Sequence, residues 1–205
     1  MIAIIDYGAG NIRSVYKALK FIGAECKITS DKDEILNADA AILPGQGAFG
    51  DCMSSMEKYG IKDTVKEFIN SGKPFLGICV GLQLLFEESE ESENVKGLGI
   101  FKGKIKKIPY EEGLKIPHMG WNSLDIIKGG GIFNGVENGS YVYFVHSYYL
   151  DAEDKDIVSA QTQYGVKIDA AVSSGNVFAT QFHPEKSGDT GLKILRNFKQ
   201  LTINN

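Results

Sequence analysis

The sequence predicts an α/β fold, with a largely parallel central sheet flanked by helices and additional antiparallel strands in the second half. In the first half, short apolar runs alternate with segments of helical spacing, which is typical of βαβ units. The second half consists mainly of strand-like runs separated by turns. Because no repeat or low-complexity linker interrupts the 205 residues, we expect a single domain over residues 1–205.

The elements of the first half follow from apolar spacing. Residues 2–6 form a short apolar run that ends in turn residues, as buried strands do. The helix expected over residues 11–22 places Val15, Leu19 and Ile22 on one face, and Gly23 is a typical stop. Further strands are expected over residues 26–29, 40–43 (ended by Pro44-Gly45) and 74–78, and further helices over residues 61–69 and 82–88. The acidic run over residues 87–93 is interpreted as a solvated helix end and loop.

The second half contributes strands and a closing helix. Its strands are expected over residues 99–108, 141–150, 157–163, 168–173 and 177–182, and its helix over residues 190–201. The three glycines at 129–131 are interpreted as a loop and not as a domain boundary.

Composition limits the possible functions. The formal net charge is −4 and no basic cluster stands out, which argues against nucleic-acid binding. Three widely spaced cysteines without a CxxC pair argue against a metal site and a disulfide framework. No apolar run approaches the ~20 residues that span a bilayer, and no signal peptide is visible. We therefore expect a cytoplasmic protein with small-molecule or protein partners, no membrane contact and no cofactor.

The strongest local signal is Gly77-Ile78-Cys79-Val80-Gly81, which lies between an apolar strand and an apolar helix. This is the small-x-nucleophile-x-small pattern of a nucleophile elbow. The turn strains the backbone at the nucleophile, so its flanking positions must be small. A helix start also favours a thiolate and supplies N–H groups to an oxyanion. The alternative is an inert buried cysteine.

A thiol nucleophile needs a base, and His183 is the best candidate of the three histidines. It follows an apolar strand, where ligand sites of α/β sheets gather, and Glu185 lies two residues beyond it. That carboxylate would fix the imidazole tautomer. From spacing alone, an ordinary exposed turn remains equally possible. His146, in an aromatic strand, and His118, in a loop, are interpreted as packed or pocket-edge residues.

The segment Pro44-Gly45-Gln46-Gly47 follows the third expected strand. Its two glycines would let the backbone turn N–H groups towards a ligand. Such donors can complete an oxyanion hole, at roughly 3–4 kcal/mol of transition-state stabilisation each. From this motif alone, a plain surface turn is the favoured interpretation.

Together, in this chain order, the segments over residues 77–83, 182–185 and 44–47 resemble those of the class I (triad) glutamine amidotransferases, over nearly the whole chain. The chain is more narrowly similar to the glutaminase subunits of imidazole glycerol phosphate synthase, an enzyme of histidine biosynthesis. This narrower resemblance rests on residues 6–11, 47–51, 117–122, 143–148 and 181–187.

The resemblance implies a fold of the glutamine amidotransferase type and a mechanism. Cys79 would attack the glutamine side-chain amide, with His183 as base and acid and Glu185 orienting it. The remaining site residues follow by position: an oxyanion hole from Gly45, Gln46, Gly47 and Val80, and a glutamine pocket lined by Gln83, Ser147 and Tyr148.

The resemblance also implies a heterodimer in which a (β/α)₈-barrel cyclase subunit consumes the ammonia. The cyclase would make imidazole glycerol phosphate and aminoimidazole carboxamide ribotide. Asn11, Tyr143 and Lys186 match positions that face this partner. The family's oxyanion segment commonly reads Pro-Gly-Val-Gly, whereas Gln46 stands here.

Three alternatives stay open at the level of sequence. The chain could serve anthranilate, aminodeoxychorismate or GMP synthesis, which share the triad. It could be a non-catalytic regulatory module of the same fold. It could also be an esterase or peptidase that uses the same elbow.

Overall fold

The computed structural model describes residues 1–202 and centres on an eight-stranded mixed sheet. Its first five strands are parallel and the last three antiparallel. In spatial order they are β2 (Cys26–Thr29), β1 (Ile2–Ile5), β3 (Ala40–Gly45), β4 (Phe75–Cys79), β13 (Val177–Thr180), β12 (Val166–Ser174), β11 (Val158–Tyr164) and β8 (Asp125–Ile126). This arrangement agrees with the predicted largely parallel sheet and its antiparallel extension.

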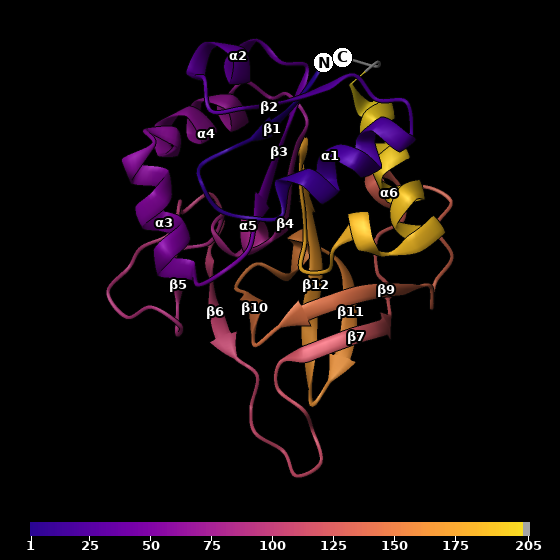
Figure 1. The fold of residues 1–205 in the computed structure, drawn as a ribbon. Coiled ribbons are helices and arrows are strands. Elements are labelled where there is room, and N and C mark those ends of the chain that lie inside the picture. Colours follow the sequence, from indigo (N-terminus) through magenta and orange to yellow (C-terminus); the bar gives the residue numbers. More distant parts are fainter. Residues whose placement is uncertain (203–205) are drawn as a thin grey trace.

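Helices cover both faces of the parallel strands (Figure 1). On one side lie α1 (Ile12–Phe21) and α6 (Gly188–Leu201), and on the other α2 (Lys32–Asn37), α3 (Phe49–Lys58) and α4 (Ile61–Asn70). As predicted, α1 buries Val15 and Leu19, and Gly23 follows its end with φ +69°. Because L side chains rarely adopt such a φ, glycine suits this helix stop.

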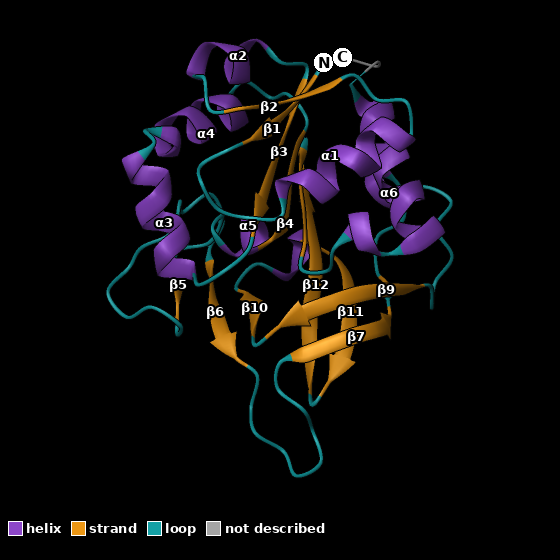
Figure 2. Cartoon of the chain, viewed as in Figure 1, coloured by secondary structure: helices purple, strands orange, loops and turns teal. Residues whose placement is uncertain are grey.

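Two smaller sheets occupy the lower half of the molecule (Figure 2). One contains β10 (Tyr148–Ala152), β6 (Gly103–Lys107) and β5 (Glu88–Ser89). The other pairs β7 (His118–Ser123) with β9 (Tyr141–His146) in antiparallel register. The remaining helical turns are η1 (Gly131–Phe133), η2 (Lys155–Ile157) and η3 (Pro184–Lys186).

The helix predicted over residues 82–88 is wrong. The observed helix α5 spans only Val80–Gln83, and the chain then turns into β5. The carbonyls that would continue the helix accept hydrogen bonds from a later segment instead: Leu98 N–H donates to Leu84 O at 2.8 Å, and Ile100 N–H to Leu85 O at 2.9 Å. Gly97 admits this approach, because a Cβ there would lie 2.1 Å from Phe86 O.

Other predicted boundaries also differ. The expected strand over residues 141–150 is two strands, β9 and β10, which separate at Ser147 and enter different sheets. The expected strand over residues 99–108 is regular only in β6. Pro44 and Gly45 belong to β3 and do not end it before residue 44. His118 lies in β7 and not in a loop. Helices α2 and α3 were not predicted.

Within residues 1–202, no helix combines the length and the apolar character that crossing a membrane requires.

Candidate active site

The Cys79 thiol lies on a strained turn between β4 and α5. Cys79 has φ +57° and ψ −110°, a conformation that side-chain-bearing residues rarely adopt. Its neighbours must be glycines: a Cβ on Gly77 would lie 2.7 Å from Gly81 O, and one on Gly81 would lie 2.0 Å from Leu43 O. The sequence motif therefore folds as the sharp elbow that its spacing predicts, and the Cys79 side chain faces a cavity.

His183 and Glu185 approach from the opposite end of the sequence. Strand β13 pairs in parallel with β4, so the segment that follows β13 lies beside the elbow. His183 Nδ1 donates to Glu185 Oε1 at 2.8 Å, and the two side chains are 4% and 1% exposed. This bond leaves Nε2 of the neutral imidazole as an acceptor.

The second imidazole nitrogen of His183, Nε2, is the one available to the Cys79 sulfur. His183 Nε2 is buried without a hydrogen bond of ordinary geometry, yet the Cys79 sulfur is close enough to affect its charge. Burial lowers the pKa of His183, but the contacts with Cys79 and Glu185 raise it more, and the result is about 9. At neutral pH His183 is therefore in its protonated, imidazolium form, and it can give a proton to a leaving group.

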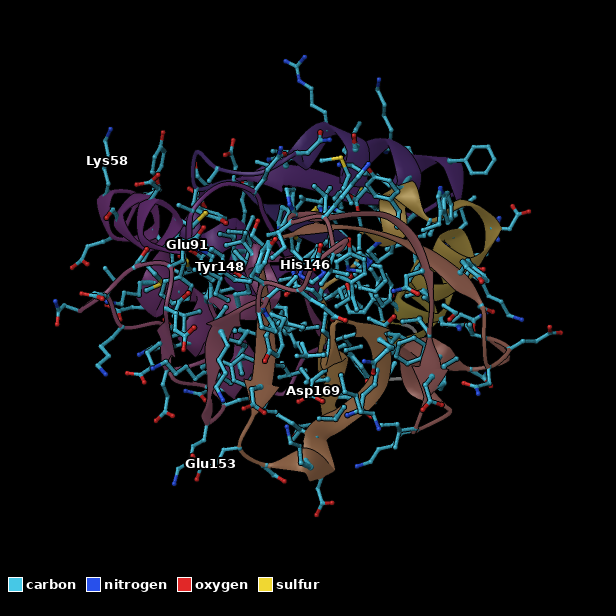
Figure 3. The ribbon with its side chains drawn as sticks, turned by 90° about the horizontal axis from the view of Figure 1, so that it is seen from below. Lys58, Glu91, His146, Tyr148, Glu153 and Asp169 are labelled. Atoms are coloured by element: carbon cyan, nitrogen blue, oxygen red, sulfur yellow. The ribbon has the colours of Figure 1, made fainter. Side chains whose placement is uncertain are left out.

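A cavity of about 250 Å³ opens over the thiol. Pockets that hold drug-sized ligands measure about 300–1,000 Å³, so this smaller cavity suits an amino-acid-sized molecule. Figure 3 labels Glu91, Tyr148 and His146, three of the residues that line the cavity. The other lining residues are Gln46, Gly47, Cys79, Val80, Gln83, Pro117, Val145, Ser147 and His183.

The structure brings most of the sequence-predicted site residues together. Gln46, Gly47 and Val80, expected at the oxyanion hole, line the cavity, as do Gln83, Ser147 and Tyr148, expected at the substrate. Gly45 lies directly beside the elbow, opposite Cys79 in the β3–β4 register. A Cβ on Gly45 would lie 2.6 Å from Gly81 N, so only glycine allows this contact.

Sequence reasoning missed two residues of the site. Gln181 is fully buried; its Nε2 lies 3.8 Å from Cys79 Sγ, and its Oε1 accepts from Gln83 Nε2 at 3.1 Å. Glu91 lines the cavity and accepts from Phe49 N–H at 2.7 Å, so the interpretation of its acidic run as solvated is wrong at this residue. Neither role has a signal in local spacing, although Gln181 belongs to the 181–187 segment singled out above.

Two buried histidines support the cavity wall. His146 Nδ1 donates to Tyr148 O at 2.9 Å, and its Nε2 lies 2.9 Å from His118 Nδ1. Burial lowers the pKa of His118 to about 4 and that of His146 to about 3. Both imidazoles are therefore neutral near pH 7, and His118 donates to His146. Gln83 Nε2 reaches the same Tyr148 carbonyl at 3.2 Å, which fixes the backbone there.

Tyr143, one of the residues expected at the partner, lies on a surface of β7 and β9 that is called the aromatic face here and consists of Met119, Trp121, Tyr141 and Tyr143. Met119, Trp121 and Tyr141 are 62%, 53% and 60% exposed. The Lys186 Nζ lies 6.0 Å from the Tyr143 ring centroid, so these two predicted residues meet. Asn11 is separate from them, at the N-cap of α1.

Comparisons with known proteins agree with this geometry. A family model described as "Glutamine amidotransferase class-I" matches residues 3–201. The chain is 56% identical over 201 residues to the imidazole glycerol phosphate synthase subunit HisH of Caldanaerobacter subterraneus subsp. tengcongensis, covering 98% of each chain. It is 53% identical over 199 residues to the subunit of the same name from Bacillus cereus (strain G9842), covering 97% of this chain and 94% of that one.

Solved structures agree in fold. A putative GMP synthase component from Thermoplasma acidophilum superposes with a TM-score of 0.74 at 21% identity, over 99% of this chain and 94% of that one. A structure described as a glutamine amidotransferase gives 0.76 at 22% identity, over 98% and 99%. The predicted fold and family resemblance are thereby confirmed. The chain belongs to the class-I glutamine amidotransferase family, among the HisH subunits of imidazole glycerol phosphate synthase.

Proposed function

We propose that this chain hydrolyses glutamine to glutamate and ammonia through a Cys79 thioester, and delivers the ammonia to a cyclase subunit in histidine biosynthesis. The observation that carries the proposal is the buried His183–Glu185 pair, bonded at 2.8 Å, beside a thiol on a strained elbow. The family membership and the names of the relatives support the same activity.

The chemistry uses these groups in order. The Cys79 thiolate attacks the side-chain amide carbon of glutamine, and the carbonyl oxygen becomes an oxyanion held by Val80 N–H and by the backbone of residues 45–47. Protonated His183 gives its proton to the amide nitrogen, so the C–N bond breaks and ammonia leaves. Water then attacks the thioester while His183 takes one of its protons, which releases glutamate and restores the thiolate.

Gln83, Ser147 and Tyr148 line the cavity and are proposed to bind the glutamine substrate. The bonds from Gln83 and His146 to the Tyr148 carbonyl support this role, because they hold the cavity backbone in one position. Gln181 joins the same network and keeps the thiol aligned.

The proposed partner is a (β/α)₈-barrel cyclase that forms a heterodimer with this chain. The aromatic face supports this assignment, since exposed large apolar side chains gathered on one surface mark protein interfaces. Tyr143 belongs to this face, Lys186 contacts Tyr143, and Asn11, at the N-cap of α1, is proposed to extend the interface. Val145 lines the cavity and pairs with Met119, so a partner seated here would adjoin the site of ammonia release.

We also propose that residues 1–205 act as one amidotransferase domain in the cytoplasm. The family model covers residues 3–201, and all three cysteines are free, as in a reducing compartment.

Complementation tests the function directly. We expect the wild-type chain to restore growth of a histidine auxotroph that lacks its glutaminase subunit, and Cys79→Ala to fail while still binding the cyclase. Rescue only of strains blocked in tryptophan, folate or GMP synthesis would assign the chain to another synthase. Undiminished ammonia release by Cys79→Ala would reject the mechanism.

A further inference from the structure

Two buried polar side chains, Tyr7 and Cys52, lie behind the backbone that faces the thiol. Tyr7 is 0% exposed and Cys52 is 1% exposed, and neither lines the cavity. The Tyr7 hydroxyl donates to Pro44 O at 2.9 Å, and the Cys52 thiol donates to Gln46 O at 3.7 Å. The triad chemistry uses neither group.

Tyr7 and Cys52 also act on each other. Burial raises the pKa of Tyr7 well above its usual range, and the neighbouring Cys52 raises it further. Burial likewise raises the pKa of Cys52. Both groups therefore remain protonated, as hydrogen-bond donation to carbonyls requires.

The two bonds control the direction of the adjacent amides. In a planar trans peptide, the C=O and N–H groups point in opposite directions. Because Tyr7 holds the Pro44 carbonyl, the Gly45 N–H turns the opposite way, towards β4, where Gly45 pairs with Cys79. Because Cys52 holds the Gln46 carbonyl, the Gly47 N–H points away from Cys52. Gln46 and Gly47 line the cavity, so the outward side of this segment is the side of the thiol.

The peptide between the two anchors lies at the end of β3, where Gly45 is the last residue that pairs with β4. Gly47 has φ +109° with open space around its Cβ position, so its conformation and not crowding requires glycine. The orientation of the Gly45–Gln46 peptide therefore depends on the pairing of Gly45 with Cys79 and on the bonds that hold the Pro44 and Gln46 carbonyls.

We propose that Tyr7 and Cys52 are positioning residues of the oxyanion hole, which fix the backbone of residues 44–47 in the position that it takes beside the reacting carbonyl. This inference rests on the proposed glutaminase function and adds two residues to it. Their removal weakens stabilisation of the oxyanion and leaves the thiol and the glutamine pocket intact.

The test compares Tyr7→Phe, Cys52→Ala and Cys52→Ser with the wild type, each assembled with the cyclase subunit. We expect Tyr7→Phe and Cys52→Ala to lower kcat for glutamine hydrolysis about tenfold or more, with KM within twofold, because lost oxyanion stabilisation acts on the transition state. Cys52→Ser keeps a donor and should retain most of the activity. Cys26→Ala, which removes another buried thiol in β2, is the matched control and should leave kcat unchanged.

Alkylation separates positioning from general damage. Iodoacetamide reacts by displacement at a saturated carbon and forms no oxyanion, so its rate at Cys79, followed by peptide mass spectrometry, should stay within twofold in every variant. An unchanged or raised kcat, or a kcat that falls together with the alkylation rate, would overturn the inference. A wild-type complex that hydrolyses no glutamine would instead reject the proposed function, and this inference with it.

Discussion

Glu185 is, after Cys79, the second residue that raises the pKa of His183. Replacing Glu185 by Gln removes a carboxylate bonded at 2.8 Å, so the pKa of His183 should fall from about 9 towards its ordinary 6.5. We expect kcat/KM for glutamine to drop about 10²–10⁴-fold, as when the orienting carboxylate of a triad is lost. The alkaline limb of the pH profile should also move from near pH 9 to lower pH, because protonated His183 must give its proton to the amide nitrogen before ammonia can leave. An unshifted alkaline limb would show that another group controls it.

Gly81 makes the closest approach at the elbow. A Cβ at this position would lie 2.0 Å from the Leu43 carbonyl oxygen, which belongs to the rigid strand β3. We expect Gly81→Ala to lower the free energy of unfolding by about 3 kcal/mol or more, because backbone must move. Gly129→Ala is the matched control: open space surrounds its Cβ position, and it should change stability by no more than about 0.5 kcal/mol. Denaturant unfolding of the two variants checks this, and equal stabilities would contradict it.

At the scale of elements, the antiparallel pair of β7 and β9 presents the aromatic face. Trp121 is 53% exposed, and its ring centroid lies 6.2 Å from that of Tyr143. Tryptophan side chains commonly dominate interface energies, at about 2 kcal/mol or more on truncation. We therefore expect Trp121→Ala to weaken cyclase binding about 30-fold or more in calorimetry. Phe21→Ala, which removes another exposed aromatic side chain, from α1, should bind normally; equal losses in both variants would place the interface elsewhere.

The sequence predicted the helices and strands whose apolar spacing is visible within the segment itself. The buried strands β1, β3 and β4 read as apolar runs, and α1 and α6 as amphipathic helices. The early end of α5 could not be predicted, because the carbonyls of residues 84–87, which would continue the helix, accept hydrogen bonds from residues 97–101 instead. The division between β9 and β10 could not be predicted either, because Ser147 alone does not signal a turn. The two strands separate because β9 pairs with β7 and β10 pairs with β6.

Site residues could likewise be predicted only where they lie in a local sequence motif. Cys79, His183 and Glu185 could be selected because each lies in a motif at a strand end. Gln181, Glu91, Tyr7 and Cys52 are brought to the site by tertiary packing alone, and residue type or spacing does not reveal that.

At the scale of the whole molecule, buried histidines should control stability in acid. His118 and His146 have pKa values lowered to about 4 and about 3, whereas an unfolded histidine titrates near 6.5. Below pH 6.5 the unfolded chain therefore binds more protons, so stability falls as the pH drops from about 6.5 towards 3. We expect the free energy of unfolding to fall by about 2–4 kcal/mol between pH 7 and pH 5.

Urea unfolding at the two pH values checks this expectation, with His118→Gln as the comparison. That variant loses one of the two titrating groups and should show about half of the wild-type pH dependence. A wild-type free energy of unfolding that does not change between pH 7 and pH 5 would contradict the interpretation that His118 and His146 are buried in their neutral form. On the alkaline side, His183 contributes stability that is complete below pH 6.5 and is lost as the pH rises through about 9.

The proposed mechanism requires that the Cys79 sulfur is the atom that bonds to the substrate. Peptide mass spectrometry after treatment with a glutamine-mimicking chloroketone measures this directly, with Cys26 and Cys52 as internal controls. We expect a single adduct on Cys79, which forms more slowly in His183→Ala and is prevented by excess glutamine. An adduct confined to another cysteine, or none on Cys79 in the folded wild-type protein, would contradict it.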